Sequence, residues 1–356
     1  MKNQVKPKLV LLLLNAVLLV FIGAMFAGVL FLQGPSHVLG NGVKKHSVTS
    51  LLPSIKTVFL IMMENKNWSS ILGSPSAPYI NDTLLPMASY TNQYYTPPHN
   101  HPSLPNYLWL EAGTNFGITK DGDPGLDHQS TTNHLTTLLS NAGYSWKVYA
   151  EGITGKTCPI KATGLYVPRH NPTVYFDDIT GNNNLKWTYC IEHERPFTEL
   201  ATDLENNTVA NYNFIVPNLC DDMHNSKCGK QGEVTNGDTW LSQNVPHILN
   251  SQAYQSGGAL FIGWDEGNND SDGPIGMIVL SPFAKGHGYS NSIYYTHSST
   301  LLTIEEIFGL TPLLGDAANA TDLSDLFVSP MPTPIPSPSP SPSPTPSPSP
   351  SPTGTT

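Results

Sequence analysis

Short apolar runs that end abruptly in polar residues constrain the fold of this sequence more than any other feature. The clearest runs are Val58–Met63, Tyr212–Val216, Ala259–Trp264 and Ile275–Leu280. Uninterrupted apolar strands are typical of a sheet covered by helices on both faces. Two segments with helical spacing of leucine and isoleucine, Thr131–Ala142 and His297–Phe308, each stop at a glycine, a common helix end. The sequence therefore predicts an α/β fold whose central, largely parallel sheet is sandwiched between helices.

Polar side chains follow three of these runs directly or within a few residues. They are Glu64 and Asn65, Asp222 and His224, and Asp265 and Glu266. In open α/β sheets, ligands bind beyond the carboxyl ends of the strands, so these residues predict one shared site. Each residue taken alone could simply cap a turn or a helix. The oxygen donors Glu64, Asn65, Asp265 and Glu266 together suit a divalent cation, whereas crowded carboxylates without one would raise each other's pKa.

The segment His99–Tyr107 is a second candidate for chemistry. Two prolines bracket Ser103 and restrict the backbone that presents its hydroxyl. A serine hydroxyl is a poor nucleophile near neutral pH, and coordination to a cation can activate it. Asn106 and the histidines of this segment could donate hydrogen bonds to phosphoryl oxygens. As a bare pattern, however, the segment is also a proline-rich loop.

Taken together, five segments resemble a known family. They are MMENKNW (62–68), HPSLPNYLWLEAGT (101–114), PNLCDDMHN (217–225), GWDEG (263–267) and THSSTLLTIEEIFGL (296–310). The chain resembles the phosphoesterase family of bacterial and fungal acid phosphatases and phospholipases C, within the alkaline phosphatase superfamily. The segments occur in the family's order and span nearly all of residues 55–316. The resemblance implies an alkaline-phosphatase-like fold and hydrolysis of phosphate esters.

The resemblance also implies roles for particular residues. Glu64, Asn65, Asp265 and Glu266 would bind one or more divalent metal ions, and Ser103 would be both a metal ligand and the nucleophile. The residues around the phosphate or the leaving group would be His101, Asn106, Asp222, His224 and His297. In the implied mechanism, Ser103 attacks phosphorus and expels the alcohol, one of the three histidines protonates the leaving oxygen, and water hydrolyses the phosphoserine. The remaining histidines show no partner pattern and are expected in surface or core positions; they include His128, His134, His170, His193, His247 and His287.

Three readings of the activity follow. The catalytic region is short for the phospholipases of this family, which favours an acid-phosphatase-like phosphomonoesterase. The alternative within the family is a phospholipase C or another phosphodiesterase, acting on a phospholipid headgroup. The alternative from a different class is a non-catalytic cell-surface binding module, and the presence of Ser103 and of the carboxylates argues against it.

The charge of the chain limits its partners. Lys and Arg number 17 and Asp and Glu 27, which gives a formal net charge of −10. The only arginines are Arg169 and Arg195. A nucleic-acid partner is not expected, because such binding needs clustered basic charge. By the same argument, a bound phosphate is expected to be held mainly by metal, histidines or backbone amides.

The two ends of the chain predict an exported protein. Residues 1–8 carry three lysines and precede an apolar run over residues 9–32, long enough to span a bilayer as an uncleaved signal-anchor. A cleaved signal peptide is the alternative. A linker (33–50) would lead to the catalytic domain (51–328) on the extracellular face. Residues 329–356 alternate Ser or Thr with Pro and predict an extended stalk that could enter a cell wall.

The four cysteines all lie in the part predicted to be exported. Their even number predicts two disulfides, as expected outside the cytoplasm. Three pairings are possible, and Cys158–Cys190 with Cys220–Cys228 is favoured because it closes short loops. A zinc site is the alternative, and the absence of a CxxC pair argues against it.

Overall fold

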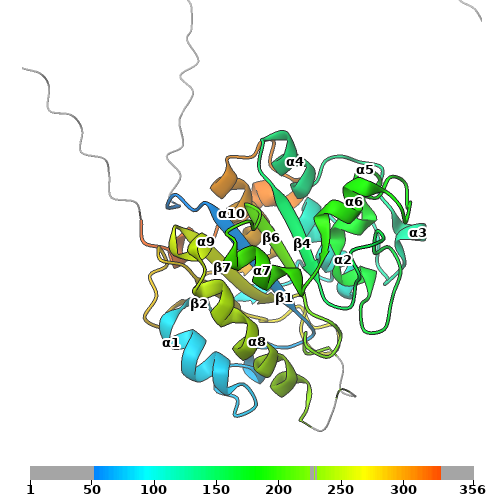
Figure 1. Cartoon of the computed structure of the whole chain (residues 1–356). Helices are drawn as coiled ribbons and strands as arrows, with labels where there is room; N and C mark the ends of the chain where they lie inside the picture. Colours follow the sequence, from blue (N-terminus) through cyan, green and yellow to red (C-terminus); the bar gives the residue numbers. More distant parts are fainter. Residues whose placement is uncertain (1–51, 225–227, 229–230, 330–356) are drawn as a thin grey trace, which may run out of the picture. The chain divides into compact units, whose positions relative to one another are not determined.

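The structure is a computed structural model that describes residues 52–224, 228 and 231–329. An eight-stranded sheet with the order β5-β4-β6-β1-β7-β8-β2-β9 lies at its centre (Figure 1). Its strands, in chain order, are β1 (Thr57–Met63), β2 (Ser89–Thr91), β4 (Trp146–Ala150), β5 (Glu194–Pro196), β6 (Tyr212–Val216), β7 (Gly258–Trp264), β8 (Met277–Leu280) and β9 (Tyr289–Asn291). β8 runs antiparallel to β7 and β2, and the other pairings are parallel. The prediction of a largely parallel sheet is confirmed.

The four apolar runs of the sequence form neighbouring strands in the middle of this sheet. β1 pairs in register with β7, so that Leu60 lies opposite Phe261 and Met63 opposite Trp264. β6, β7 and β8 are buried along their whole length, and β1 is buried from its second residue onward. Side chains of a strand alternate between the two faces, so burial of every residue requires cover on both faces.

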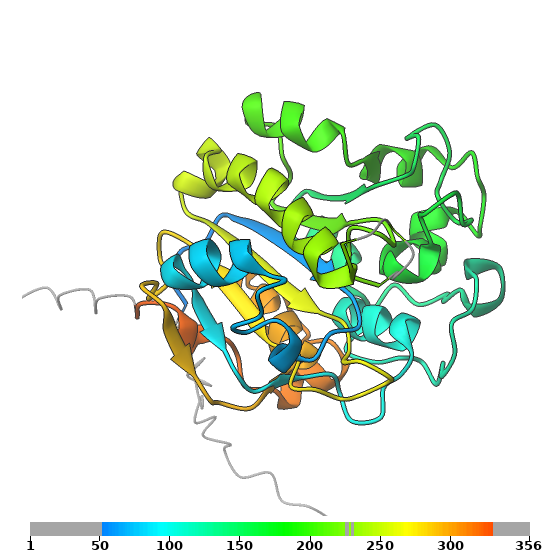
Figure 2. The ribbon, with the colours of Figure 1, turned by 90° about the horizontal axis from the view of Figure 1, so that it is seen from below.

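Two groups of helices provide this cover. The helices are α1 (Leu85–Met87), α2 (Ser103–Ala112), α3 (Pro124–Asp127), α4 (Leu135–Asn141), α5 (Asp177–Thr180), α6 (Thr188–His193), α7 (Glu199–Glu205), α8 (Glu233–Leu249), α9 (Gln252–Gln255) and α10 (His297–Phe308). α2, α4 and α10 pack against one another, and α8 packs against α7 and α9. The two groups lie on opposite faces of the sheet (Figures 1 and 2). A small two-stranded sheet, β3 (Tyr94–Tyr95) with β10 (Tyr295–Thr296), leads into α10.

The two helices expected from the sequence are both present. α10 has the predicted bounds; the Thr296 side chain caps its first turn and Gly309 ends it with a φ of 63°. α4 begins at Leu135, later than the predicted start at Thr131. The backbone of His134 is extended, with φ −150° and ψ 162°, and its ring is bound between Glu111 and Asp178. These contacts keep the residues before Leu135 out of the helix.

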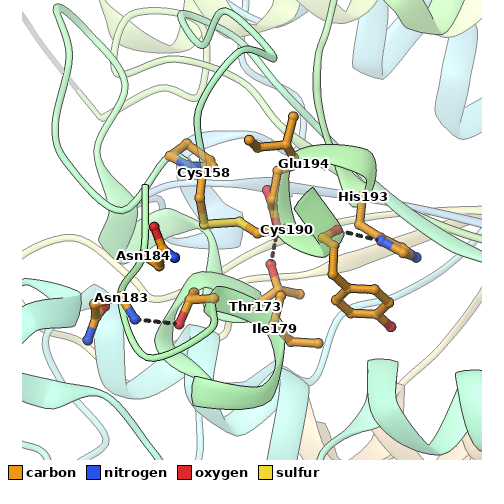
Figure 3. Close-up of a disulfide and its surroundings, with 12 residues drawn as sticks. Cys158, Thr173, Ile179, Asn183, Asn184, Cys190, His193 and Glu194 are labelled. Carbon is orange, nitrogen blue, oxygen red and sulfur yellow. Dashed lines mark hydrogen bonds between the residues drawn. A yellow bond between two sulfur atoms is a disulfide. The ribbon is translucent and has the colours of Figure 1, made fainter. Parts of the chain in front are cut away.

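A long excursion, residues 151–193, connects β4 to β5. It contains α5, α6 and the short 3₁₀ helices η3 (Pro168–His170) and η4 (Pro172–Tyr175). Cys158 and Cys190 are joined within it as a disulfide, and Glu194 follows close by (Figure 3). Cys220 and Cys228 form the second disulfide. Both pairs are those favoured for their short loops.

The predicted signal-anchor (9–32), the linker and residues 330–356 of the predicted stalk lie outside the described residues. Among the residues that are described, no helix is both long and apolar enough to cross a membrane.

Candidate active site

Three carboxylates meet at the carboxyl ends of β1, β6 and β7. Glu64 directly follows β1, Asp265 directly follows β7, and Asp222 lies in the turn after β6; all three are buried. Backbone hydrogen bonds join the three strand ends, because Glu64 N donates to Asp222 O at 2.7 Å and Asp265 N to Met63 O at 3.0 Å. The strand-end residues predicted to share one site therefore lie side by side.

Ser103 is the first residue of α2 and lies against this cluster. Its Oγ donates a hydrogen bond of 3.1 Å to Glu64 Oε2. Tyr107, one turn further along α2, donates from its hydroxyl to Glu64 Oε1 at 2.5 Å. Asn65 adopts the left-handed conformation, with φ 52°, which asparagine tolerates well. Its amide nitrogen Nδ2 reaches Glu64 Oε2 at 3.0 Å, and its backbone N–H donates to Asp265 Oδ1 at 3.0 Å.

His101, Asn106 and Glu266 form a second group beside Ser103. Glu266 Oε2 contacts His101 Nδ1 at 2.7 Å and accepts a hydrogen bond from Asn106 Nδ2 at 3.2 Å. The other ring nitrogen of His101 contacts Asp272 Oδ1 at 2.7 Å. Asn106 Nδ2 also donates to Pro102 O, so both of its amide hydrogens are used inside the site. Burial, and then the negative charge of Asp265, raise the pKa of Glu266 to about 9.

His297 is fully buried in the wall of the site. Its Nε2 lies 2.6 Å from the backbone oxygen of Asp265 and its Nδ1 lies 3.1 Å from the Tyr94 hydroxyl. Burial lowers the pKa of His297 to about 4, so its ring is neutral across the physiological range. These contacts fix the backbone that carries Asp265.

His170 joins the cluster from the excursion between β4 and β5, although the sequence indicated no role for it. Its Nε2 lies 3.3 Å from Glu64 Oε1 and its Nδ1 lies 3.3 Å from Asp222 Oδ2. The ring stacks on Tyr107 with 5.2 Å between centroids and 7° between planes, and the His224 ring lies 5.7 Å away. Burial and the nearby charge of Arg169 lower the pKa of both histidines, which favours the neutral imidazole that binds metals. His170 belongs to no strand-end motif, so no sequence signal marked it.

The cluster fits a divalent cation. Three buried polar atoms, His170 Nε2, Asp222 Oδ2 and Asp265 Oδ2, make no hydrogen bond among the described residues, whereas buried polar atoms are ordinarily satisfied. Burial, together with the charges of the neighbouring carboxylates, raises the pKa values of Glu64 and Asp222, and burial raises that of Asp265 to about 6. One atom each from Glu64, His170 and His224 lie within 4.8 Å of one another, close enough to share an ion.

The site thus places a serine hydroxyl on a buried carboxylate at the carboxyl edge of a largely parallel α/β sheet, where ligands of such folds bind. Residues 88–311 match the model of the Phosphoesterase family, and the chain belongs to this family. It is 30% identical over 278 residues to a phosphatidylinositol-3-phosphatase of Mycobacterium tuberculosis, covering 78% of this chain and 85% of that protein. The chain is a phosphoric ester hydrolase, and the alternative of a non-catalytic binding module is set aside.

More distant relatives are also named as phosphatases. A probable acid phosphatase of Kluyveromyces lactis is 26% identical over 77% of this chain and 65% of its own length. A phosphate-repressible acid phosphatase of Penicillium chrysogenum is 26% identical over 61% of this chain. The chain thus spans 51% to 65% of these two fungal proteins. A Vibrio parahaemolyticus structure from the alkaline phosphatase superfamily shares the fold, with a TM-score of 0.50 and 10% identity over 74% of this chain and 69% of that one.

Proposed function

We propose that this enzyme is a metal-dependent phosphomonoesterase that works through a phosphoserine at Ser103. The contact between Ser103 Oγ and the buried Glu64 carboxylate is the observation that carries the proposal. Ser103 also lies at the first turn of a ten-residue helix, where the helix dipole favours an incoming anion.

Two sets of residues are suited to hold divalent cations. The oxygen-rich set is Glu64, Asn65, Ser103, Asp265 and Glu266. The second set combines Glu64 with His170 and His224, and Asp222 lies beside it. A bound cation supplies positive charge that lowers the pKa of a hydroxyl and stabilises charge developing on phosphoryl oxygens.

The protein's own groups then account for the proton movements. As Ser103 Oγ forms its bond to phosphorus, its proton passes to Glu64 Oε2, which already accepts it in a hydrogen bond. The bond between phosphorus and the leaving oxygen breaks, and that oxygen takes a proton from His101, which is partly exposed. His297 is fully buried and positions Asp265 instead. Water then attacks the phosphoserine and gives a proton back to His101, while the proton held by Glu64 returns to Ser103 Oγ as phosphate leaves.

The names of the relatives support a monoester substrate. Phosphatidylinositol-3-phosphatase and acid phosphatase both denote hydrolysis of phosphate monoesters, whether on a lipid headgroup or a small molecule. Phosphodiester hydrolysis of the phospholipase C type remains the alternative that the assay below distinguishes.

We further propose that the catalytic domain, residues 51–328, acts outside the cytoplasm. The two disulfides support this location. Anchoring through residues 9–32 and display by the stalk at 329–356 remain proposals that rest on the sequence.

Release of p-nitrophenol by the purified full chain tests the function. The assay compares the mono- and bis-p-nitrophenyl esters of phosphate, with and without a chelator, and includes Ser103→Ala. We expect turnover of the monoester that the chelator and the substitution each abolish. Preference for the bis ester would favour the phosphodiesterase alternative, and full activity of Ser103→Ala would refute the phosphoserine.

A further inference from the structure

Two cationic side chains, Lys66 and Arg169, lie beside the carboxylate cluster. All the hydrogen-bond donors of Lys66 have partners within the protein. Lys66 Nζ donates to Asn65 O at 3.0 Å and to Met223 O at 2.8 Å, and pairs with Glu233 Oε2 at 2.8 Å. An ammonium group has three N–H donors, so Lys66 has none left for a ligand. Its side chain is also buried.

Arg169, in contrast, keeps most of its donors free. Among the described residues it forms one ion pair, from Nε to Asp121 Oδ2 at 3.3 Å, and the buried Nε makes no hydrogen bond to any of them. No hydrogen bond from its two Nη groups to another described residue is present, and 24% of the side chain is exposed. The other arginine, Arg195, contacts Glu199 through Nε and Nη2 at 2.8 and 2.7 Å, and Ile191 O through Nη1 at 2.6 Å.

Two short chains of contacts connect Arg169 to the nucleophile. Asp121, its ion-pair partner, accepts the backbone N–H of Leu104 at 3.0 Å, one residue after Ser103. His170, its neighbour in η3, lies 3.3 Å from the same Glu64 carboxylate that accepts the Ser103 hydroxyl. The charge of Arg169 also reaches both His170 and His224.

The electrostatics of the site call for such a cation. The carboxylates of Glu64, Asp222, Asp265 and Glu266 would oppose the approach of an anionic substrate even after a divalent ion offsets part of their charge. An arginine is always protonated and presents a planar set of donors that matches two oxygens of one phosphate. A monoester offers three terminal oxygens and up to two negative charges, whereas a diester offers two oxygens and one charge.

We propose that Arg169 binds the phosphate group of the substrate and makes the site selective for dianionic phosphomonoesters over monoanionic diesters. This inference rests on the proposed phosphoesterase function and names its substrate-binding cation. It adds one arginine to the metal, histidine and backbone groups that the sequence predicts as phosphate ligands.

The experiment compares wild type, Arg169→Lys and Arg169→Gln, with Arg195→Gln as the matched control. Circular dichroism and thermal melting establish that each variant is folded at the assay temperature. Two measurements are made on each: kcat and KM for mono- and bis-p-nitrophenyl phosphate, and the Kd of inorganic phosphate by calorimetry. The second measurement does not require turnover.

For Arg169→Gln we expect KM for the monoester and Kd for phosphate to rise by about tenfold or more, the usual effect of losing a charge-assisted hydrogen bond. KM for the diester should rise by a clearly smaller factor. A diester has one negative charge and one terminal oxygen fewer than a monoester, so it loses less when Arg169 is removed. Arg169→Lys should recover part of the loss, and Arg195→Gln should match wild type.

Unchanged phosphate Kd and monoester KM in Arg169→Gln, in an enzyme whose wild type turns over, would overturn the role of Arg169 and leave the proposed function intact. Equal losses on the two esters would overturn the selectivity. A wild type that neither hydrolyses the esters nor binds phosphate would overturn both proposals.

Discussion

Ser103 Oγ and Glu64 Oε2 lie 3.1 Å apart although 39 residues separate them in the chain. Glu64 directly follows the central strand β1 and Ser103 begins α2, so the carboxyl edge of the sheet and a helix N-terminus meet at one hydrogen bond. The same carboxylate also accepts the Tyr107 hydroxyl and contacts His170. Glu64 is therefore the residue on which the proposed nucleophile and the proposed metal ligands converge.

Glu64→Gln should lower kcat strongly while the fold is kept. The amide preserves the size of the side chain but cannot accept the Ser103 proton. We expect a fall of about a hundredfold to ten-thousandfold, the range for loss of a general base. Initial rates on p-nitrophenyl phosphate measure the effect, and the exposed Glu205→Gln serves as control. A fall of less than tenfold would exclude Glu64 as the proton acceptor.

His170→Asn should weaken metal binding. The substitution removes an imidazole from the set formed with Glu64 and His224. We expect metal affinity to fall by about 10- to 100-fold or more. Mutation of residues that only hydrogen-bond to metal ligands already lowers metal affinity by this factor. Mass-spectrometric metal content after dialysis, and titration with zinc or manganese, measure the change. The exposed His247→Asn is the control, and equal metal content in the two variants would contradict the proposal.

The strand-end residues of the site could be predicted from the sequence because their position follows from local pattern. Glu64, Asp265 and Asp222 each follow an apolar run, and parallel strands bring such ends to one edge. His170 and Arg169 could not be found in this way. They lie in η3, inside an irregular excursion whose path is set by tertiary contacts rather than by periodicity.

The sequence also could not predict which side chains the site residues would contact. His101 is predicted to lie near the phosphate, and its ring nitrogens contact Glu266 and Asp272, which the sequence did not indicate. Asp272 lies in the loop between β7 and β8, which no motif connects with His101. Such pairings depend on how loops fold back over the sheet, and single-sequence patterns do not encode that path.

Loss of the Cys158–Cys190 disulfide should destabilise the excursion that carries His170. The bond spans 32 residues, and constraining a loop of this length in the unfolded chain contributes about 3 to 4 kcal/mol. The double variant Cys158→Ala/Cys190→Ala should lose that amount in urea unfolding. The Cys220–Cys228 disulfide closes a loop of only 8 residues. The double variant Cys220→Ala/Cys228→Ala should therefore lose less free energy of unfolding. The opposite order would show that strain or local packing, rather than loop length, decides the effect.

Glu194 should make the protein less stable as the pH rises. Its carboxylate is fully buried, accepts hydrogen bonds from Asn171 and Thr173, and lies beside the disulfide (Figure 3). Burial raises its pKa from 4.5 to about 7. The folded state therefore holds the proton more tightly than the unfolded chain. The resulting stabilisation, about 3 kcal/mol at most, is complete below about pH 4.5 and is lost as the pH rises through about 7.

Urea unfolding between pH 4 and 8 tests this prediction with Glu194→Gln, which stays neutral throughout. The free energy of unfolding of wild type should fall relative to this variant across the range. The exposed neighbour Glu192→Gln should follow wild type. Parallel curves for wild type and Glu194→Gln would show that Glu194 is ionised in the folded protein at all these pH values.

His134 should add a second loss of stability, at higher pH. The ring is buried between Glu111, at 2.9 Å, and Asp178, at 3.1 Å, and it ties α2 to α4 and α5. Burial alone would lower its pKa, but the hydrogen bonds and charges of Asp178 and Glu111 outweigh it and raise the pKa above 6.5. The stabilisation by the charged ring is therefore complete below pH 6.5 and is lost as the pH rises through the folded-state pKa.

His134→Gln should cost about 3 kcal/mol at pH 6, because removing the cation leaves two carboxylates without their partner. The cost should shrink as the pH rises, since wild type then loses the same charge. Urea unfolding at pH 6 and pH 9 measures the cost at each pH. His128→Gln is the control, because the His128 ring contacts Asp177 near the surface. A cost that is equal at the two pH values would mean that packing against Phe176, at 3.9 Å between ring centroids, holds His134 in place rather than its charge.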